Sequence, residues 1–90
     1  MDEDPIVLPI DGILDLHTFH PREVKELVPE YLEECRKRGI LSVRIIHGKG
    51  QGTLRRIVLS LLEKNPQVAG FKPAEINRGG WGATMIQLKP

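Results

Sequence analysis

The chain has 90 residues, enough for one domain and too few for two separate hydrophobic cores. Hydrophobic residues make up 40% and charged residues 28% of it, as is typical of globular domains. No apolar stretch approaches the roughly 18 residues that a membrane span needs, so a transmembrane protein is excluded. The net charge of +1 decides little by itself, because Met1–Asp4 is acidic whereas the centre of the chain is basic.

Cys35 is the only cysteine, so an internal disulfide is excluded and a reducing compartment is favoured. It lies on the apolar stripe of a helical pattern, and we expect it to be a small buried hydrophobe rather than a nucleophile. The N-terminus lacks the basic region and apolar run of a signal peptide. We therefore expect a cytoplasmic protein that does not associate with membranes.

Residues 1–12 are predicted to form an N-terminal arm, because Pro5 and Pro9 interrupt any periodic pattern. Residues 13–90 are predicted to form a single domain. It begins with Ile13–His17, whose partial alternation of apolar and polar residues favours a β-strand.

A helix should follow, with Pro21 in its first turn and Thr18 or His20 as its cap. Pro29 should kink this helix or divide it in two, because proline lacks an NH and crowds the preceding turn. Gly39 supplies the stop. The apolar positions repeat every three or four residues, as on one helical face: Val24, Leu27, Val28, Tyr31, Leu32 and Cys35.

Ser42–His47 is predicted to be the second strand. The second helix should have Thr53 as its N-cap and end at Asn65 and Pro66. Its apolar stripe comprises Leu54, Ile57, Val58, Leu61 and Leu62.

Val68–Lys72 and Ala83–Leu88 are predicted to be the last two strands, with a turn or flexible loop at 77–80. The order is then β-α-β-α-β-β. The first two strands, joined through a helix, should be parallel, and the last two should be antiparallel neighbours. Because each helix has one apolar stripe, we expect an α/β protein with a four-stranded mixed sheet and two helices on one face.

The corner after the second predicted strand carries most of the functional information. Gly48, Gly50 and Gly52 permit left-handed backbone and close approach of a ligand, and Lys49 lies among them. Arg55 and Arg56 fall in the first turn of the next helix, where cations oppose the helix dipole unless an anion binds there. The spacing matches neither the P-loop nor the Rossmann fingerprint. A phosphate site is favoured over two merely solvated arginines.

Two histidines end the first two predicted strands, His17 and His47. If these strands are adjacent and parallel, both imidazoles lie at the same edge of the sheet, where ligands of open α/β sheets tend to bind. Asp15 shares a face with His17 and can orient its ring for acid–base chemistry. The alternatives are buried, hydrogen-bonded histidines or a metal site, and zinc is disfavoured because the potential ligands are dispersed.

Three segments together resemble one known family, the small MutS-related (Smr) domain. Leu14–His17 is similar to its L-D-x-H motif, His47–Gly52 to its H-G-x-G-x-G motif, and Gly79–Thr84 to its G-G-x-G-A-T motif. The resemblance covers roughly Ile13 to Leu88, and three motifs in the same order are a strong signal.

The resemblance implies a two-layer α/β sandwich, similar to the C-terminal domain of bacterial translation initiation factor three. It also implies binding of DNA or RNA, often with endonuclease activity that uses Asp15, His17 and the loop from His47 to Gly50. It fixes no cofactor and no metal ligands, and leaves a requirement for Mg²⁺ open.

We therefore predict a nucleic-acid-binding domain that cleaves phosphodiester bonds, with Asp15, His17 and His47 as catalytic residues. The predicted phosphate-binding residues are Gly48, Lys49, Gly50, Gly52, Arg55 and Arg56. Trp81, flanked by glycines, either stacks on an unpaired base or folds back on its own domain. The alternatives are a binding module without catalysis and a protein-interaction domain with a basic loop. The sequence gives no oligomeric state.

Overall fold

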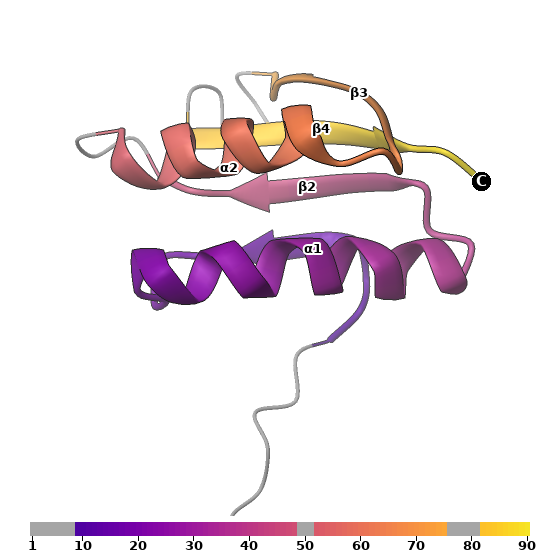
Figure 1. The fold of residues 1–90 in the computed structure, drawn as a ribbon, viewed down its shortest axis with the longest axis horizontal. Coiled ribbons are helices and arrows are strands. Elements are labelled where there is room, and N and C mark those ends of the chain that lie inside the picture. Colours follow the sequence, from indigo (N-terminus) through magenta and orange to yellow (C-terminus); the bar gives the residue numbers. More distant parts are fainter. Residues whose placement is uncertain (1–8, 49–51, 76–81) are drawn as a thin grey trace, which may run out of the picture.

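The computed structural model describes residues 9–48, 52–75 and 82–90. Their elements follow the predicted order β-α-β-α-β-β (Figure 1). The elements are β1 (Ile13–Asp15), α1 (Pro21–Lys37), β2 (Ser42–Ile46), α2 (Thr53–Lys64), β3 (Val68–Pro73) and β4 (Ala83–Leu88). The predicted loop at 77–80 lies outside the described residues. Neither described helix is long and apolar enough to span a bilayer.

The strands form one mixed sheet in the order β1-β2-β4-β3. β1 pairs with β2 in parallel, as predicted, with Asp15 opposite Ile46. β3 and β4 are antiparallel neighbours, also as predicted, and β4 returns between β3 and β2. This order places the ends of β1 and β2 next to the start of β4.

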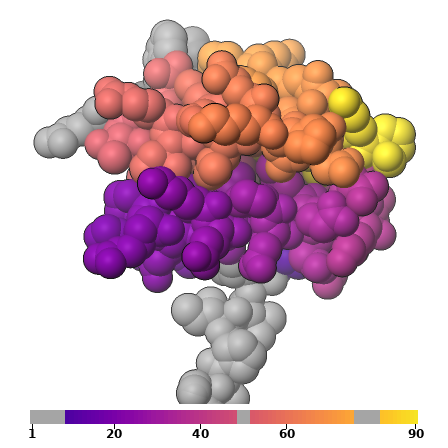
Figure 2. All heavy atoms as spheres, viewed as in Figure 1, coloured from indigo at the N-terminus to yellow at the C-terminus, as the bar shows by residue number. Residues whose placement is uncertain are grey.

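Both helices lie on the same face of the sheet (Figure 1), and in the space-filling view they cover most of it (Figure 2). Strand residues alternate between this covered face and the open face. On the covered face, the apolar side chains of three strands meet those of both helices in one buried core. Its members are Leu14, Leu16, Val24, Val28, Tyr31, Leu32, Cys35, Val43, Ile45, Val58, Leu62, Ile86 and Leu88. Cys35 is thus buried as expected, and burial raises the pKa of its thiol.

Helix α1 begins with a reciprocal cap. His20 is the N-cap, as one of the two predicted alternatives: its Nδ1 accepts from the backbone NH of Arg22, and Glu23 accepts from the backbone NH of His20. Of the two predicted effects of Pro29, a kink or a division, the division does not occur, since α1 continues through Pro29. The carbonyl that Pro29 cannot bond belongs to Lys25, which is exposed, so water can satisfy it.

The described part of the predicted arm contacts the domain. The hydroxyl of Tyr31 accepts a hydrogen bond from the backbone NH of Gly12 at 3.1 Å, and the carbonyl of Gly12 accepts from the NH of Arg44 at 2.7 Å. Gly12 has a φ of +89°, and a Cβ there would lie 3.2 Å from the carbonyl oxygen of Ser42. Glycine is therefore required where the chain enters β1.

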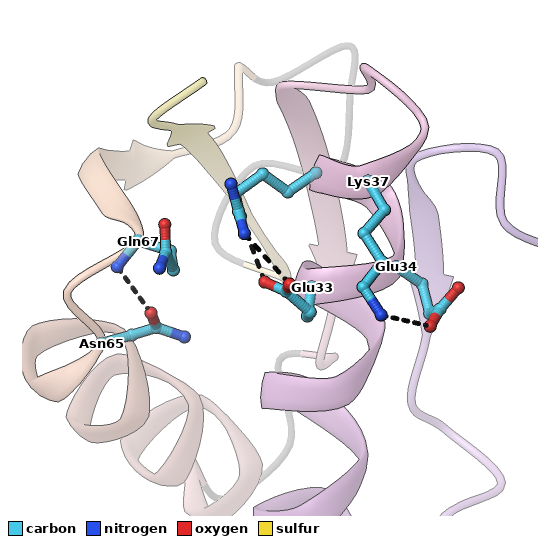
Figure 3. Close-up of polar contacts among 6 residues, drawn as sticks. Glu33, Glu34, Lys37, Asn65 and Gln67 are labelled. Carbon is cyan, nitrogen blue, oxygen red and sulfur yellow. Dashed lines mark hydrogen bonds and ion pairs between the residues drawn. The ribbon is translucent and has the colours of Figure 1, made fainter.

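The C-terminal ends of both helices lie at the end of the domain opposite the carboxyl ends of β1 and β2 (Figure 1). Figure 3 shows the polar contacts there, including the ion pair of Glu34 with Lys37 and the hydrogen bond between Asn65 and the backbone of Gln67. Such exposed ion pairs contribute at most about 1 kcal/mol each. The buried core, rather than these pairs, holds the fold together.

Candidate nucleic-acid interface at the carboxyl ends of β1 and β2

The carboxyl ends of β1 and β2 lie at one edge of the sheet, where α2 also begins (Figure 1). Pairing extends one residue past β1, because the NH of Leu16 donates to the carbonyl of Ile46 at 2.8 Å. His17 and His47 both follow this last shared bond. The register therefore brings the two predicted histidines to the same edge.

The two histidines do not share an environment. Asp15 pairs with Ile46 and so belongs to the open face of the sheet. His47 continues the alternation of Val43 and Ile45, which places it on the covered face. His17 is exposed, whereas His47 retains only 5% of its accessible surface.

Asp15 and His17 form an exposed carboxylate–imidazole pair. Oδ1 of Asp15 lies 2.8 Å from Nδ1 of His17 and accepts from the backbone NH of His17 at 3.0 Å. The backbone hydrogen bond, and then the ring contact, lower the pKa of the Asp15 carboxyl. A carboxylate only accepts, so Nδ1 carries the proton in this contact. In neutral His17, Nε2 therefore carries a lone pair and can accept a proton.

His47 has both ring nitrogens engaged. Nδ1 lies 3.1 Å from the carbonyl oxygen of Gly48, and Nε2 lies 2.9 Å from Oγ1 of Thr84. Burial is the main cause that lowers the pKa of His47, and nearby Arg55 lowers it further, although the Gly48 carbonyl opposes them. These surroundings favour the neutral ring over the imidazolium, and they match the alternative of a buried, hydrogen-bonded histidine.

The start of β4 closes the corner from the other side. The carbonyl oxygen of Gly82 accepts from the backbone NH groups of both His47 and Gly48, each at 2.9 Å. Gly48 has a φ of +79°, in the region that favours glycine. The end of β2 and the residue that opens β4 are therefore fixed to each other.

Helix α2 begins without a side-chain cap among the described residues. The predicted cap was wrong: Thr53 is the first helical residue, and Gly52, at φ +82°, is the N-cap. The first turn contains Arg55 and Arg56 but no acidic residue, so two cations lie at the positive end of the helix dipole. These arginines and Gly52 line a hollow of about 490 Å³ that continues along α2 to Glu63.

Three predicted site residues lie outside the described residues: Lys49, Gly50 and Trp81.

A second hollow, of about 510 Å³, lies on the open face between β2, β4 and β3, and no predicted site residue lines it. Within the described ranges, no group of three His, Cys, Asp or Glu side chains is arranged to hold a metal ion.

Two residues of the corner, Thr84 and Gly82, were not among the predicted site residues. Thr84 is the polar member of a buried alternation that continues with Ile86 and Leu88. A polar residue at a buried strand position needs a hydrogen-bond partner. That pattern was visible in the sequence and pointed to Thr84, whereas the carbonyl of Gly82 had no such signal.

The chain is similar to proteins of a known family. The family model of the Smr domain matches residues 14–89. Proteins named endonuclease MutS2 are similar: that of Carboxydothermus hydrogenoformans is 40% identical over 76 residues, and that of Clostridium tetani is 34% identical over 80 residues. These matches cover 84% and 89% of this chain. The chain spans only about 10% of the length of these relatives.

Two solved structures share the fold, each with a TM-score of 0.84. The Smr domain of Thermus thermophilus MutS2 is 34% identical, and the match covers 88% of this chain and 99% of that one. YdaL, a stand-alone small MutS-related protein from Escherichia coli, is 26% identical, with coverage of 91% and 67%. By its sequence, its sheet and its helices, the chain belongs to the Smr domain family.

Proposed function

We propose that the domain binds DNA or RNA at this corner and cleaves its phosphodiester backbone. The observation that carries the proposal is the Asp15–His17 pair, an exposed imidazole whose Nδ1 faces a carboxylate at 2.8 Å. No described residue hydrogen-bonds Nε2 of His17, which leaves that nitrogen for a substrate proton. The name endonuclease, which the MutS2 relatives carry, supports the same reaction class.

In the proposed reaction, Nε2 of His17 takes the proton of the attacking oxygen. That oxygen belongs to water or, in RNA, to the neighbouring 2′-hydroxyl. It forms a bond to phosphorus while the bond from phosphorus to the leaving oxygen breaks, and the leaving oxygen takes a proton from solvent. Asp15 holds the ring and stabilises the imidazolium that forms.

The phosphate would be held by the start of α2. Its first NH groups, which no side chain among the described residues caps, offer hydrogen bonds to an anion, and Arg55 and Arg56 add positive charge. Gly48 leaves the described backbone open to close approach, because no described atom beyond its chain neighbours lies within 4 Å of the position that a Cβ would take. Lys49, Gly50 and Gly52 are proposed to add phosphate contacts, and Trp81 to stack on an unpaired base.

The second candidate is a binding module without catalysis. It is favoured by the burial of His47, which leaves His17 as the only one of the two predicted catalytic histidines that can reach a substrate. Such a module would bind nucleic acid with a strong salt dependence, because each neutralised phosphate releases counterions, but would form no product. The single domain at residues 13–90 and a cytoplasmic location also remain predictions.

The deciding experiment incubates the purified protein with labelled single-stranded RNA, nicked DNA and branched DNA, each with and without Mg²⁺. We expect the wild type to cleave at least one substrate, and His17→Ala to lower the rate about 100-fold or more, as for loss of a general base. His20→Asn is the matched control, because asparagine also caps helices and His20 only caps α1.

Binding without product in every condition would favour the binding module. Equal cleavage by wild type and His17→Ala would remove His17 from the mechanism. Failure to bind any of the three nucleic acids would refute the proposal altogether.

A further inference from the structure

The imidazole of His47 has both ring nitrogens in hydrogen bonds, and the proposed reaction does not use it. The carbonyl of Gly48 can only accept, so Nδ1 of His47 must carry the ring proton. In the neutral ring, Nε2 is then an acceptor, and the hydroxyl of Thr84 donates to it at 2.9 Å. The donor and the acceptor of both hydrogen bonds are therefore determined, and this fixes the tautomer of His47.

This chain of hydrogen bonds connects two strands. Thr84 lies on β4 and is 2% exposed, and His47 lies just beyond β2. The same strands are also joined through the backbone, since Gly82 accepts from the NH groups of His47 and Gly48. The ring of His47 therefore fixes the carbonyl of Gly48 while Gly82 fixes its NH.

We propose that Thr84 is a positioning residue of the nucleic-acid site, acting through His47 on the backbone of Gly48. His47 then holds the backbone of Gly48 by a hydrogen bond and does not exchange protons with the substrate. This inference rests on the proposed function, because it assigns the corner's two histidines different duties: His17 reacts, and His47 shapes the backbone that faces the phosphate.

Two variants separate the hydroxyl of Thr84 from its shape. Thr84→Val replaces the hydroxyl by a methyl group and leaves Nε2 of His47 buried without a donor, whereas Thr84→Ser keeps the donor. Leaving one buried acceptor without a donor corresponds to a change of roughly five- to 150-fold in the equilibrium between the closed and the opened corner. We expect Thr84→Val to speed amide exchange of Gly48 and to raise the Kd for single-stranded RNA by about that factor, and Thr84→Ser to restore most of both.

A merely structural defect would act on the whole sheet. The amide chemical shifts of Arg44 and Ile86, in the middle of β2 and β4, therefore serve as the internal control and should stay close to those of the wild type. The cleavage rate at saturating RNA should change less than the Kd, and the shape of its pH profile should stay unchanged, because neither Thr84 nor His47 exchanges a proton in the reaction.

Imidazole ¹⁵N spectra of the wild type test the inference without any substrate. They should show His47 as the neutral tautomer with its proton on Nδ1. A proton on Nε2, or Gly48 exchange that is the same in Thr84→Val as in the wild type, would overturn it. A wild type that binds no nucleic acid would refute the proposed function, while these two spectroscopic results would still decide whether Thr84 holds Gly48 through His47.

Discussion

We expect the arginines at the start of α2 to lower the stability of the fold while they increase its affinity for nucleic acid. Arg56 is exposed in the first turn, where a cation is unfavourable by about 0.3–1 kcal/mol and an anion is favourable by a similar amount. Arg56→Glu removes the first effect and adds the second. It should therefore raise the free energy of unfolding by about 0.6–2 kcal/mol at low salt. In a domain of this size, that corresponds to a rise in Tm of several degrees, at about 4–8 °C per kcal/mol.

The same substitution should weaken nucleic-acid binding. Loss of one phosphate contact lowers the slope of log K against log salt by about 1, and charge reversal adds repulsion. Thermal unfolding and titration with labelled single-stranded RNA, each at two salt concentrations, measure both effects. Lys64→Glu is the matched control, an identical charge change in the last turn of α2, and should lower Tm while leaving affinity nearly unchanged.

A lower Tm together with unchanged affinity for Arg56→Glu would contradict both expectations, the gain in stability and the loss of binding. It would mean that Arg56 is stabilised by its surroundings and does not face an anion. A higher Tm with unchanged affinity would keep the dipole argument but would remove Arg56 from the phosphate site.

Three further predictions concern single residues of the corner. Gly48→Ala should cost about 1–2 kcal/mol in urea unfolding, from backbone strain at φ +79° and not from a clash; an unchanged midpoint would contradict this. Because the pKa of His47 is lowered in the fold, the unfolded chain binds more protons than the folded one. The free energy of unfolding should therefore decline as pH falls below about 6.5, by at most about 1.4 kcal/mol per pH unit, and His47→Gln should flatten this dependence. Asp15→Asn should slow cleavage only about fivefold or less, because the exposed Asp15–His17 pair contributes at most about 1 kcal/mol and the amide oxygen still orients His17. A loss of rate of about 100-fold would show instead that Asp15 contacts the substrate or a metal.

The elements of the fold were predictable because their patterns are local. Apolar residues at helical spacing defined α1 and α2, and the linking helix required β1 and β2 to be parallel. The position of β4 between β2 and β3 was not predictable in this way, since it depends on pairing between distant segments. The continuity of α1 through Pro29 was predictable from the same helical pattern, because Lys25 lies outside the apolar stripe and is exposed, so water can satisfy its carbonyl.

The meeting of His17 and His47 at one edge of the sheet was predictable, but their different roles were not predicted. Strand order alone brings His17 and His47 together, whereas the alternation within β2 places His47 under the helices. The strand order predicts only the shared edge, whereas the alternation predicts that the two side chains lie on opposite faces of the sheet. The cap of α2 was missed for a different reason: Thr53 is a good capping residue, but the left-handed turn at Gly52 makes that glycine the cap instead.

The most direct test of the nucleic-acid interface maps the backbone amide shifts of the ¹⁵N-labelled protein on addition of single-stranded RNA. We expect shifts at His17, Gly48 and the first turn of α2, and none at the opposite end, around Lys37 and Gln67. Shifts confined to that opposite end, or to the hollow on the open face of the sheet, would show that nucleic acid binds elsewhere on the domain.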